Sequence, residues 1–117
     1  MTIRRGEIWL ADLRPGRGTE PGKIRPVLVV QAQALLDAGH PSTLVAPLST
    51  QLVRGIRILR VRAVAQGDLH EDSDVLIDQI LAIDNLRFSR GPLVLLDRAT
   101  MAHVDQALAR VLGLADA

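Results

Sequence analysis

Arg25 stands where a polar loop meets an apolar strand, a position that suits an arginine that binds an anion. Proline and glycine punctuate residues 14–24 and oppose regular structure there, whereas residues 27–30 form an uninterrupted apolar run typical of a strand buried on both faces. Pro26 favours extended backbone at Arg25, which holds the guanidinium at the strand entry. A guanidinium held in this way matches the geometry of a phosphate. From the loop alone, an equally open alternative is that Arg25 pairs with a carboxylate or caps carbonyl groups.

The elements that must position this arginine are mainly strands. Short runs rich in valine, leucine and isoleucine recur along the first hundred residues and are separated by glycine, proline and polar residues. We expect strands at residues 7–13, 25–31, 43–47, 56–64, 74–77, 80–84 and 93–96, and a short helix within residues 32–39.

One amphipathic helix is expected near the end of the sequence, over residues 99–112. The apolar residues that recur along it at spacings of three or four are Met101, Val104, Leu108 and Val111. Asp97 or Thr100 is expected to cap its start, and Gly113 stands where a helix commonly ends.

Short strands, glycine-rich turns and one packing helix predict a mainly β fold with one C-terminal α-helix. We expect a small, strongly bent, SH3-like β-barrel. The 117 residues, of which 48% are hydrophobic, are enough for a single domain over residues 1–117 with its own core. Cysteine is absent, which excludes disulfides, thiol catalysis and thiolate-bound zinc and suits a reducing cytoplasm. No targeting segment is visible, and no apolar run approaches the roughly 18 residues of a membrane span, so we expect a soluble, cytoplasmic protein.

The net charge of +1 hides a separation of charge along the chain. Basic residues predominate in residues 1–25 and stand unopposed in residues 54–62, whereas residues 63–84 carry six acidic residues and no lysine or arginine. One interpretation is a basic face for the phosphates of RNA. The alternative is that the arginine and aspartate blocks neutralise each other across neighbouring strands.

Aromatic residues and histidines offer little for binding or catalysis. The chain has one tryptophan, Trp9, one phenylalanine, Phe88, and no tyrosine. Both aromatic side chains are expected in the core or an interface rather than as base-stacking platforms. His40, His70 and His103 are expected on the surface or a helix flank, which argues against a catalytic pair of histidines. The sequence also shows no compact cluster of aspartate and histidine for a metal.

Three groups of residues, in matching order and spacing, resemble the MazF/PemK family of toxin endoribonucleases from residue 4 to about residue 112. The matching segments are residues 5–13, 18–20 and 22–26, then the turn at 47–50, then 74–80 with Ile83 and Asp84. The resemblance implies a CcdB-like barrel and the toxin of a type II toxin-antitoxin system. It also implies a metal-independent endoribonuclease that cleaves single-stranded RNA, including mRNA, at specific sequences and so inhibits translation and growth.

The same resemblance assigns roles to individual residues. The family's catalytic threonine falls on Ser49, which keeps the hydroxyl group. Arg25 would stabilise the phosphoryl oxygens and Ser49 would donate a hydrogen bond to the same centre. Attack by the 2′-hydroxyl then gives a 2′,3′-cyclic phosphate and a 5′-hydroxyl, with no metal or cofactor. The general base stays open, because family mechanisms give the arginine acid or base duty although a guanidinium holds its proton at neutral pH; Glu20 is the alternative.

The remaining contacts to RNA are expected from polar side chains of the same loops and of the third matching segment. They are Arg17, Thr19, Lys23, Thr50, Arg54, Arg57, Asp78 and Gln79. The resemblance further implies a symmetric homodimer with two sites along one groove, and a cognate MazE-like antitoxin whose acidic, disordered tail folds across it.

Two other functions stay open at this point. One is a non-enzymatic, CcdB-like toxin that binds DNA gyrase, which would have no need for a paired arginine and hydroxyl. The other is a degenerate member that binds RNA or antitoxin without cutting, which is credible because serine replaces threonine at Ser49.

Overall fold

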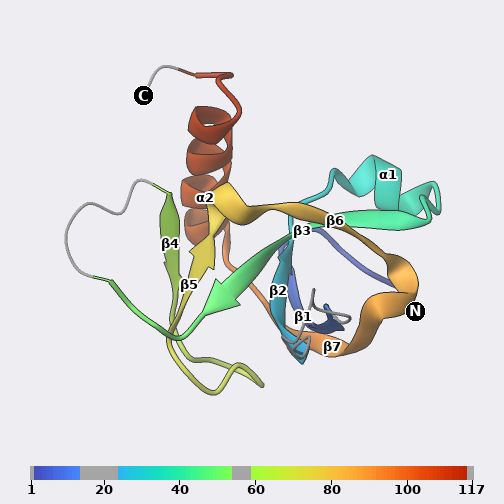
Figure 1. Cartoon of the computed structure of the whole chain (residues 1–117), viewed down its shortest axis with the longest axis horizontal. Coiled ribbons are helices and arrows are strands. Elements are labelled where there is room, and N and C mark those ends of the chain that lie inside the picture. Colours follow the sequence, from blue (N-terminus) through green and yellow to red (C-terminus); the bar gives the residue numbers. More distant parts are fainter. Residues whose placement is uncertain (1, 14–23, 54–58, 116–117) are drawn as a thin grey trace, which may run out of the picture.

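The strands of this protein are all antiparallel to their neighbours, and β3 lies at the centre of their arrangement (Figure 1). The structure, a computed structural model, describes residues 2–13, 24–53 and 59–115. Its elements are β1 (Glu7–Asp12), β2 (Ile24–Val29), α1 (Gln33–Asp37), β3 (Ser42–Ser49), β4 (Arg60–Ala63), β5 (Ser73–Leu76), the 3-10 turn η1 (Ile77–Gln79), β6 (Leu81–Asp84), the 3-10 turn η2 (Asn85–Arg87), β7 (Phe88–Leu95) and α2 (Arg98–Val111).

The seven strands form one bent sheet rather than a closed barrel. Their order is β4-β5-β3-β2-β1-β7, and β6 also pairs with β3. The strands β4 and β7 are the two ends of this path among the described residues. The expectation of a mainly β fold with one C-terminal helix is confirmed.

The strand β3 is long enough to pair with three other strands. Its first half, Ser42 to Val45, pairs with β6, and its last two residues, Leu48 and Ser49, pair with β5. Between them, β2 pairs with residues 45–47. The end of β3 is therefore the point where β2 and β5 come together.

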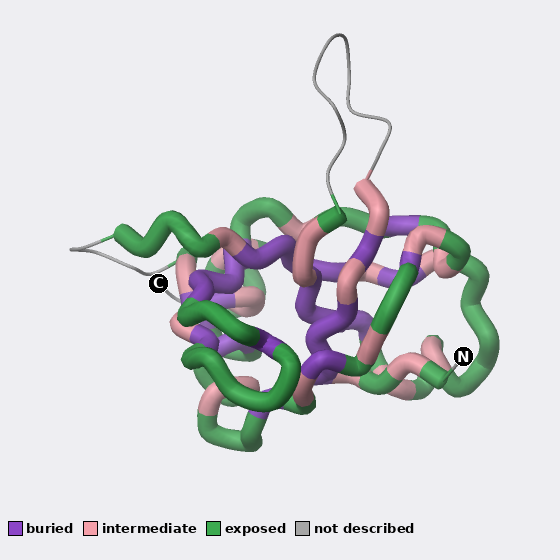
Figure 2. Tube along the Cα trace, turned by 90° about the horizontal axis from the view of Figure 1, so that it is seen from below, coloured by how far each residue is buried: buried purple, intermediate pink, exposed green. Residues whose placement is uncertain are grey.

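Two apolar clusters lie on opposite faces of the sheet, because successive side chains of a strand point to opposite sides. In β2, Leu28 belongs to the main core, whereas Val27 and Val29 belong to the second core. This confirms that residues 27–30 are buried on both faces. The buried segments run through the middle of the molecule, with exposed segments around them (Figure 2).

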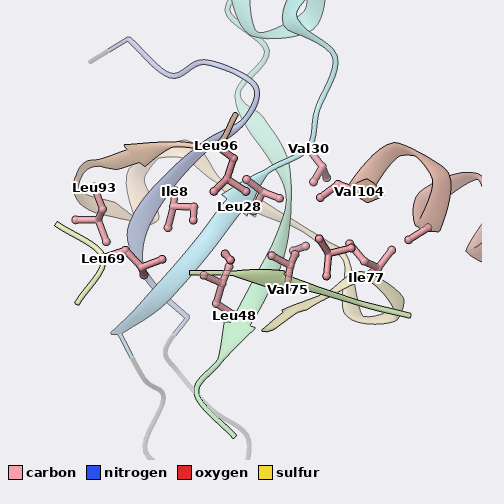
Figure 3. Close-up of a cluster of buried hydrophobic side chains, with 14 residues drawn as sticks. Ile8, Leu28, Val30, Leu48, Leu69, Val75, Ile77, Leu93, Leu96 and Val104 are labelled. Carbon is pink, nitrogen blue, oxygen red and sulfur yellow. The ribbon is translucent and has the colours of Figure 1, made fainter. Parts of the chain in front are cut away.

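The main core is closed by α2, which packs Val104 and Ala107 against residues from several strands (Figure 3). The helix begins and ends as expected. The carboxylate of Asp97 accepts a hydrogen bond from the Thr100 backbone N–H at 2.7 Å. At the other end Gly113 has a φ of +72°, a left-handed conformation that suits glycine and ends the helix.

The second core contains both aromatic side chains expected there. Trp9 is 5% and Phe88 4% exposed, and their rings meet edge to face with centroids 5.7 Å apart. The indole N–H of Trp9 donates to Glu7 at 3.1 Å, so its polar group is satisfied inside the protein. Neither ring is available as a stacking platform for a base.

The strand β7 begins at Phe88, five residues earlier than the expected start at residue 93. Glycine and proline oppose a strand locally, but β7, which contains Gly91 and Pro92, lies at the end of the sheet, where proline is tolerated. Its pairing with β1 is also irregular, with register shifts on both sides of Leu10. In the described part of the chain, neither helix is long and apolar enough to cross a membrane.

Candidate active site

Arg25 and Ser49 lie at the adjoining ends of β2 and β3. The pairing of β2 with β3 ends at Val27 and Pro47, and Arg25 and Ser49 each stand two residues beyond this pair. Successive side chains of a strand alternate between faces, so each of the two residues projects from the same face as the member of that pair on its own strand. The two strand ends stay close, since Pro26 and Thr50 line one cavity.

The backbone of Arg25 is held in β2, and its guanidinium has no charged partner in the part of the chain that the structure describes. Arg25 is half-buried in β2, where its backbone pairs with Ala11 of β1. Within the described residues its side chain makes no ion pair and no hydrogen bond. The structure therefore gives no support, over these residues, to the alternative in which Arg25 only pairs with a carboxylate or caps carbonyls.

The hydroxyl of Ser49 is oriented by the backbone that follows β3. The Gln51 backbone N–H donates to Ser49 Oγ at 3.1 Å. A hydroxyl group whose oxygen already accepts a hydrogen bond still has its own proton to donate. Ser49 is half-buried, so this proton is available to a group that binds beside Arg25.

An ion cluster around the buried Asp74, formed with Arg60 and Arg62, lies beyond Ser49. Ser49 pairs with Asp74 of β5, and Asp74 pairs in turn with Arg62 of β4. The Asp74 side chain is fully buried; Arg62 Nε lies 2.7 Å from its Oδ1, and Arg60 Nη1 lies 3.5 Å from its Oδ2. Arginines and an aspartate of the two blocks therefore pair across neighbouring strands, but two guanidinium groups face one carboxylate, so the neutralisation is partial for these three residues.

The ion cluster is joined to Ser49 through the backbone of one residue, Gln51. Arg60 Nη1 donates to the Gln51 carbonyl oxygen at 3.1 Å, while the Gln51 N–H donates to Ser49 Oγ. Sequence reasoning assigned no role to Asp74 or Gln51. The available signal was the alternation of Arg60 and Arg62, which puts two arginines on one face of a strand next to an acid-bearing strand.

The other predicted site residues divide into three groups. Those that lie outside the described residues are Arg17, Thr19, Glu20, Lys23, Arg54 and Arg57. Thr50 is exposed and follows Ser49 directly. Asp78 and Gln79 are exposed on η1, alongside the middle of β3 rather than at the strand ends that carry Arg25 and Ser49, so one chain does not bring them to those ends.

Two hollows border this region. A cavity of about 280 Å³ lies behind Pro26 and Thr50 and is lined by apolar residues such as Leu69 and Leu93, with polar residues such as His70 and Arg90. A groove of about 400 Å³ separates β4 from α2. His40, His70 and His103 are all exposed, and the described ranges contain no group of three or more histidine and acidic residues placed to hold a metal ion.

A bent antiparallel sheet with one C-terminal helix is a fold that this chain shares with solved structures of MazF proteins. The toxin MazF-mt6 of Mycobacterium tuberculosis shares the fold with a TM-score of 0.75 and 24% identity, over 94% of this chain and 99% of that one. A MazE-MazF structure from Deinococcus radiodurans gives a TM-score of 0.78 and 21% identity, over 98% and 99% of the two chains.

Sequence comparison narrows the class to one family. The model of the PemK-like, MazF-like toxins of type II toxin-antitoxin systems matches residues 4–112, and the chain belongs to this family. Endoribonuclease EndoA of Bacillus subtilis is 35% identical over 120 aligned residues, which cover 99% of both chains.

Proposed function

We propose that this protein is a metal-independent endoribonuclease that cleaves single-stranded RNA, as the toxin of a type II toxin-antitoxin system. The observation that carries the proposal is the half-buried Arg25, whose guanidinium has no charged partner among the described residues, beside the strand end that carries the oriented hydroxyl of Ser49. An anion with several oxygens, such as a phosphodiester, satisfies both groups at once. The 35% identity to an endoribonuclease over nearly the whole chain supports the same reaction.

The reaction uses a hydroxyl group of the substrate as nucleophile. The 2′-oxygen of a ribose attacks the adjacent phosphorus, the bond from phosphorus to the 5′-oxygen breaks, and a 2′,3′-cyclic phosphate and a 5′-hydroxyl result. Arg25 stabilises the charge on the phosphoryl oxygens, and Ser49 donates its proton in a hydrogen bond to one of them. A base takes the 2′-proton, and the leaving 5′-oxygen gains one. Glu20, outside the described residues, is the base we propose.

Selectivity for certain sequences is assigned to the polar residues around this centre. Thr50 is adjacent to Ser49, and Asp78 and Gln79 are exposed on η1. Together with Arg17, Thr19, Lys23, Arg54 and Arg57 they would bind phosphates and the edges of unpaired bases. Because η1 lies away from the strand ends that carry Arg25 and Ser49 within one chain, a second copy is the natural source of Asp78 and Gln79 for each site.

The proposed assembly is a homodimer that a MazE-like antitoxin inhibits. The related structure from Deinococcus radiodurans is a MazE-MazF structure, and its fold matches 98% of this chain. We propose a cytoplasmic location, where mRNA is the substrate at hand and where a chain without cysteine needs no oxidising environment.

End-group analysis tests the chemistry of the proposal. Purified protein incubated with long single-stranded RNA in EDTA should give discrete fragments with 2′,3′-cyclic phosphate and 5′-hydroxyl ends. A short RNA with one 2′-deoxy nucleotide at the identified cleavage site should remain intact, since its nucleophile is missing. Cleavage of this deoxy substrate would contradict the mechanism. RNA left intact over many sequences would favour gyrase binding or RNA binding without cutting.

A further inference from the structure

The buried carboxylate of Asp74 needs an explanation beyond stability. Removing a carboxylate from water costs several kcal/mol, and two guanidinium groups compensate this cost here. Apolar side chains of similar size are often at least as stabilising as a buried ion pair. The feature that an apolar residue would not supply is the fixed placement of Arg60 and Arg62.

The two arginines keep positive charge and hydrogen-bond donors after pairing with Asp74. Two guanidinium groups share one carboxylate, and their side chains are 27% and 32% exposed. Arg62 uses Nε and Arg60 uses Nη1, so within the described residues the two Nη groups of Arg62 and the Nη2 of Arg60 have no protein partner. Both arginines border the groove between β4 and α2, and His103 and Arg110 border it from the helix.

The arginines stand in line with the proposed cleavage centre. Ser49, Asp74 and Arg62 are successive members of one cross-strand row, so Arg62 lies two strand spacings, about 10 Å, from Ser49. Arg60 lies two residues along β4 on the same face. The row that begins at Ser49 therefore leads to Arg62, and both arginines line the groove between β4 and α2.

We propose that Arg60 and Arg62 form a second phosphate-binding site, which holds a phosphate flanking the scissile one, and that Asp74 fixes their guanidinium groups for it. The site rests on the proposed function, because it binds the RNA that Arg25 and Ser49 cut. Planar guanidinium forks with free donors match phosphate oxygens bidentately. RNA is favoured over an acidic peptide because the arginines continue the row that contains the cleavage centre.

The salt dependence of cleavage tests this site. Arg62→Gln should lower kcat/KM about tenfold at low salt, as expected for the loss of a hydrogen bond between charged groups. The slope of log kcat/KM against log salt concentration should become shallower by about 0.7, the value for one phosphate contact on a single strand. Arg4→Gln, which removes an exposed arginine remote from this row in the chain, is the matched control and should leave the slope unchanged.

Neutral linkages locate the contact. In a short RNA cut by the wild-type protein, methylphosphonate linkages are placed one at a time along the strand. At one flanking position, a methylphosphonate linkage should slow cleavage by the wild-type protein about as much as Arg62→Gln slows cleavage of the unmodified RNA. The same linkage should not slow cleavage by the Arg62→Gln variant any further. Equal profiles for wild type and Arg62→Gln would overturn the inference, as would a variant that weakens binding of an acidic antitoxin peptide but leaves the RNA profile unchanged. If the wild-type protein cuts no RNA, the proposed function fails instead.

A second variant separates placement from charge. Asp74→Asn keeps the size of the side chain but weakens its hold on the two guanidinium groups. Circular dichroism first establishes that the Asp74→Asn protein is folded. If it is not folded, the test of the phosphate-binding site rests on Arg62→Gln alone. A folded Asp74→Asn protein should show the same loss at the flanking linkage as Arg62→Gln. An unchanged profile would contradict the positioning role of Asp74.

Discussion

The proposed reaction needs only the hydroxyl group of Ser49, so another side chain with a hydroxyl group can replace serine there. The Gln51 N–H fixes the oxygen and leaves the proton free to donate. Ser49→Ala should lower the single-turnover rate of RNA cleavage about 100-fold or more, the effect of losing one such donor. Ser49→Thr should stay within about threefold of the wild type, because the donor is retained. Equal rates for the alanine and wild-type proteins would remove Ser49 from the mechanism.

Gly91 is required by the packing of Trp9. A Cβ atom at residue 91 would lie 2.4 Å from Trp9 Cδ2, and the ring is already packed against Phe88. Gly91→Ala should destabilise the protein by about 1–3 kcal/mol, as overpacked cores do. Urea unfolding followed by the emission of Trp9, the only tryptophan, measures this and also reports the displaced ring.

Gly39→Ala is the control for that substitution. No atom lies within 4 Å of a Cβ there, although the φ of +76° costs about 1 kcal/mol for alanine. Its native emission spectrum should equal that of the wild type. The packing argument is wrong if Gly91→Ala matches Gly39→Ala in both stability and spectrum.

Some residues of this region can be singled out from the sequence, and others cannot. Arg25 and Ser49 were identified because a loop-to-strand junction and a family motif point to them. Asp74 was placed in an apolar strand, but its burial between two arginines depends on which strands become neighbours, and β4 and β5 pair only through tertiary structure. The link from Gln51 to Ser49 depends on backbone direction after β3, which composition does not encode.

Among the elements, α2 has a pH-dependent start. The hydrogen bonds from the backbone and side chain of Thr100 lower the pKa of Asp97 below its ordinary value of 3.8. A carboxyl whose pKa is lowered in the folded state adds stability that is fully present above pH about 4 and is lost as the pH falls through the lowered pKa. The melting temperature of the wild type should therefore fall faster with acid, below about pH 4, than that of Asp97→Asn.

The comparison of Asp97→Asn with Asp97→Ala isolates the cap from the charge. Asparagine still accepts the hydrogen bond from the Thr100 N–H, whereas alanine leaves it without this partner. At neutral pH we expect Asp97→Asn to melt close to the wild type and Asp97→Ala to melt lower. Identical acid profiles for wild type and Asp97→Asn would show that the charge of Asp97 contributes nothing.

Local sequence patterns were enough to predict which helices and strands form. The residues at which they begin and end depend on tertiary contacts. The apolar periodicity, the capping aspartate and Gly113 were enough to predict α2. The early start of β7 was missed, since Gly91 and Pro92 oppose a strand locally and only the end position in the sheet permits them. The sequence also could not predict that the sheet stays open, because closure into a barrel depends on the positions of β4 and β7 relative to each other.

At the scale of the whole molecule, the proposed dimer is the feature that completes the site. Light scattering at micromolar concentration should give a mass twice that of the chain, because Asp78 and Gln79 lie away from the strand end that carries Arg25 within one copy. The melting temperature should rise with protein concentration, as for any assembly that stabilises the folded state. A monomer at tens of micromolar that still cuts RNA would contradict the shared site.

The central claim is that Arg25 is the electrostatic centre of RNA cleavage, and its removal is the most direct test. Wild type, Arg25→Ala and the control Arg4→Gln are compared on one single-stranded RNA in EDTA, after circular dichroism and Trp9 emission establish that all three are folded. We predict that Arg25→Ala cuts at least about 100-fold more slowly at the same positions, and that the control cuts like the wild type. Cleavage by Arg25→Ala at the wild-type rate would contradict the account and move the active site elsewhere.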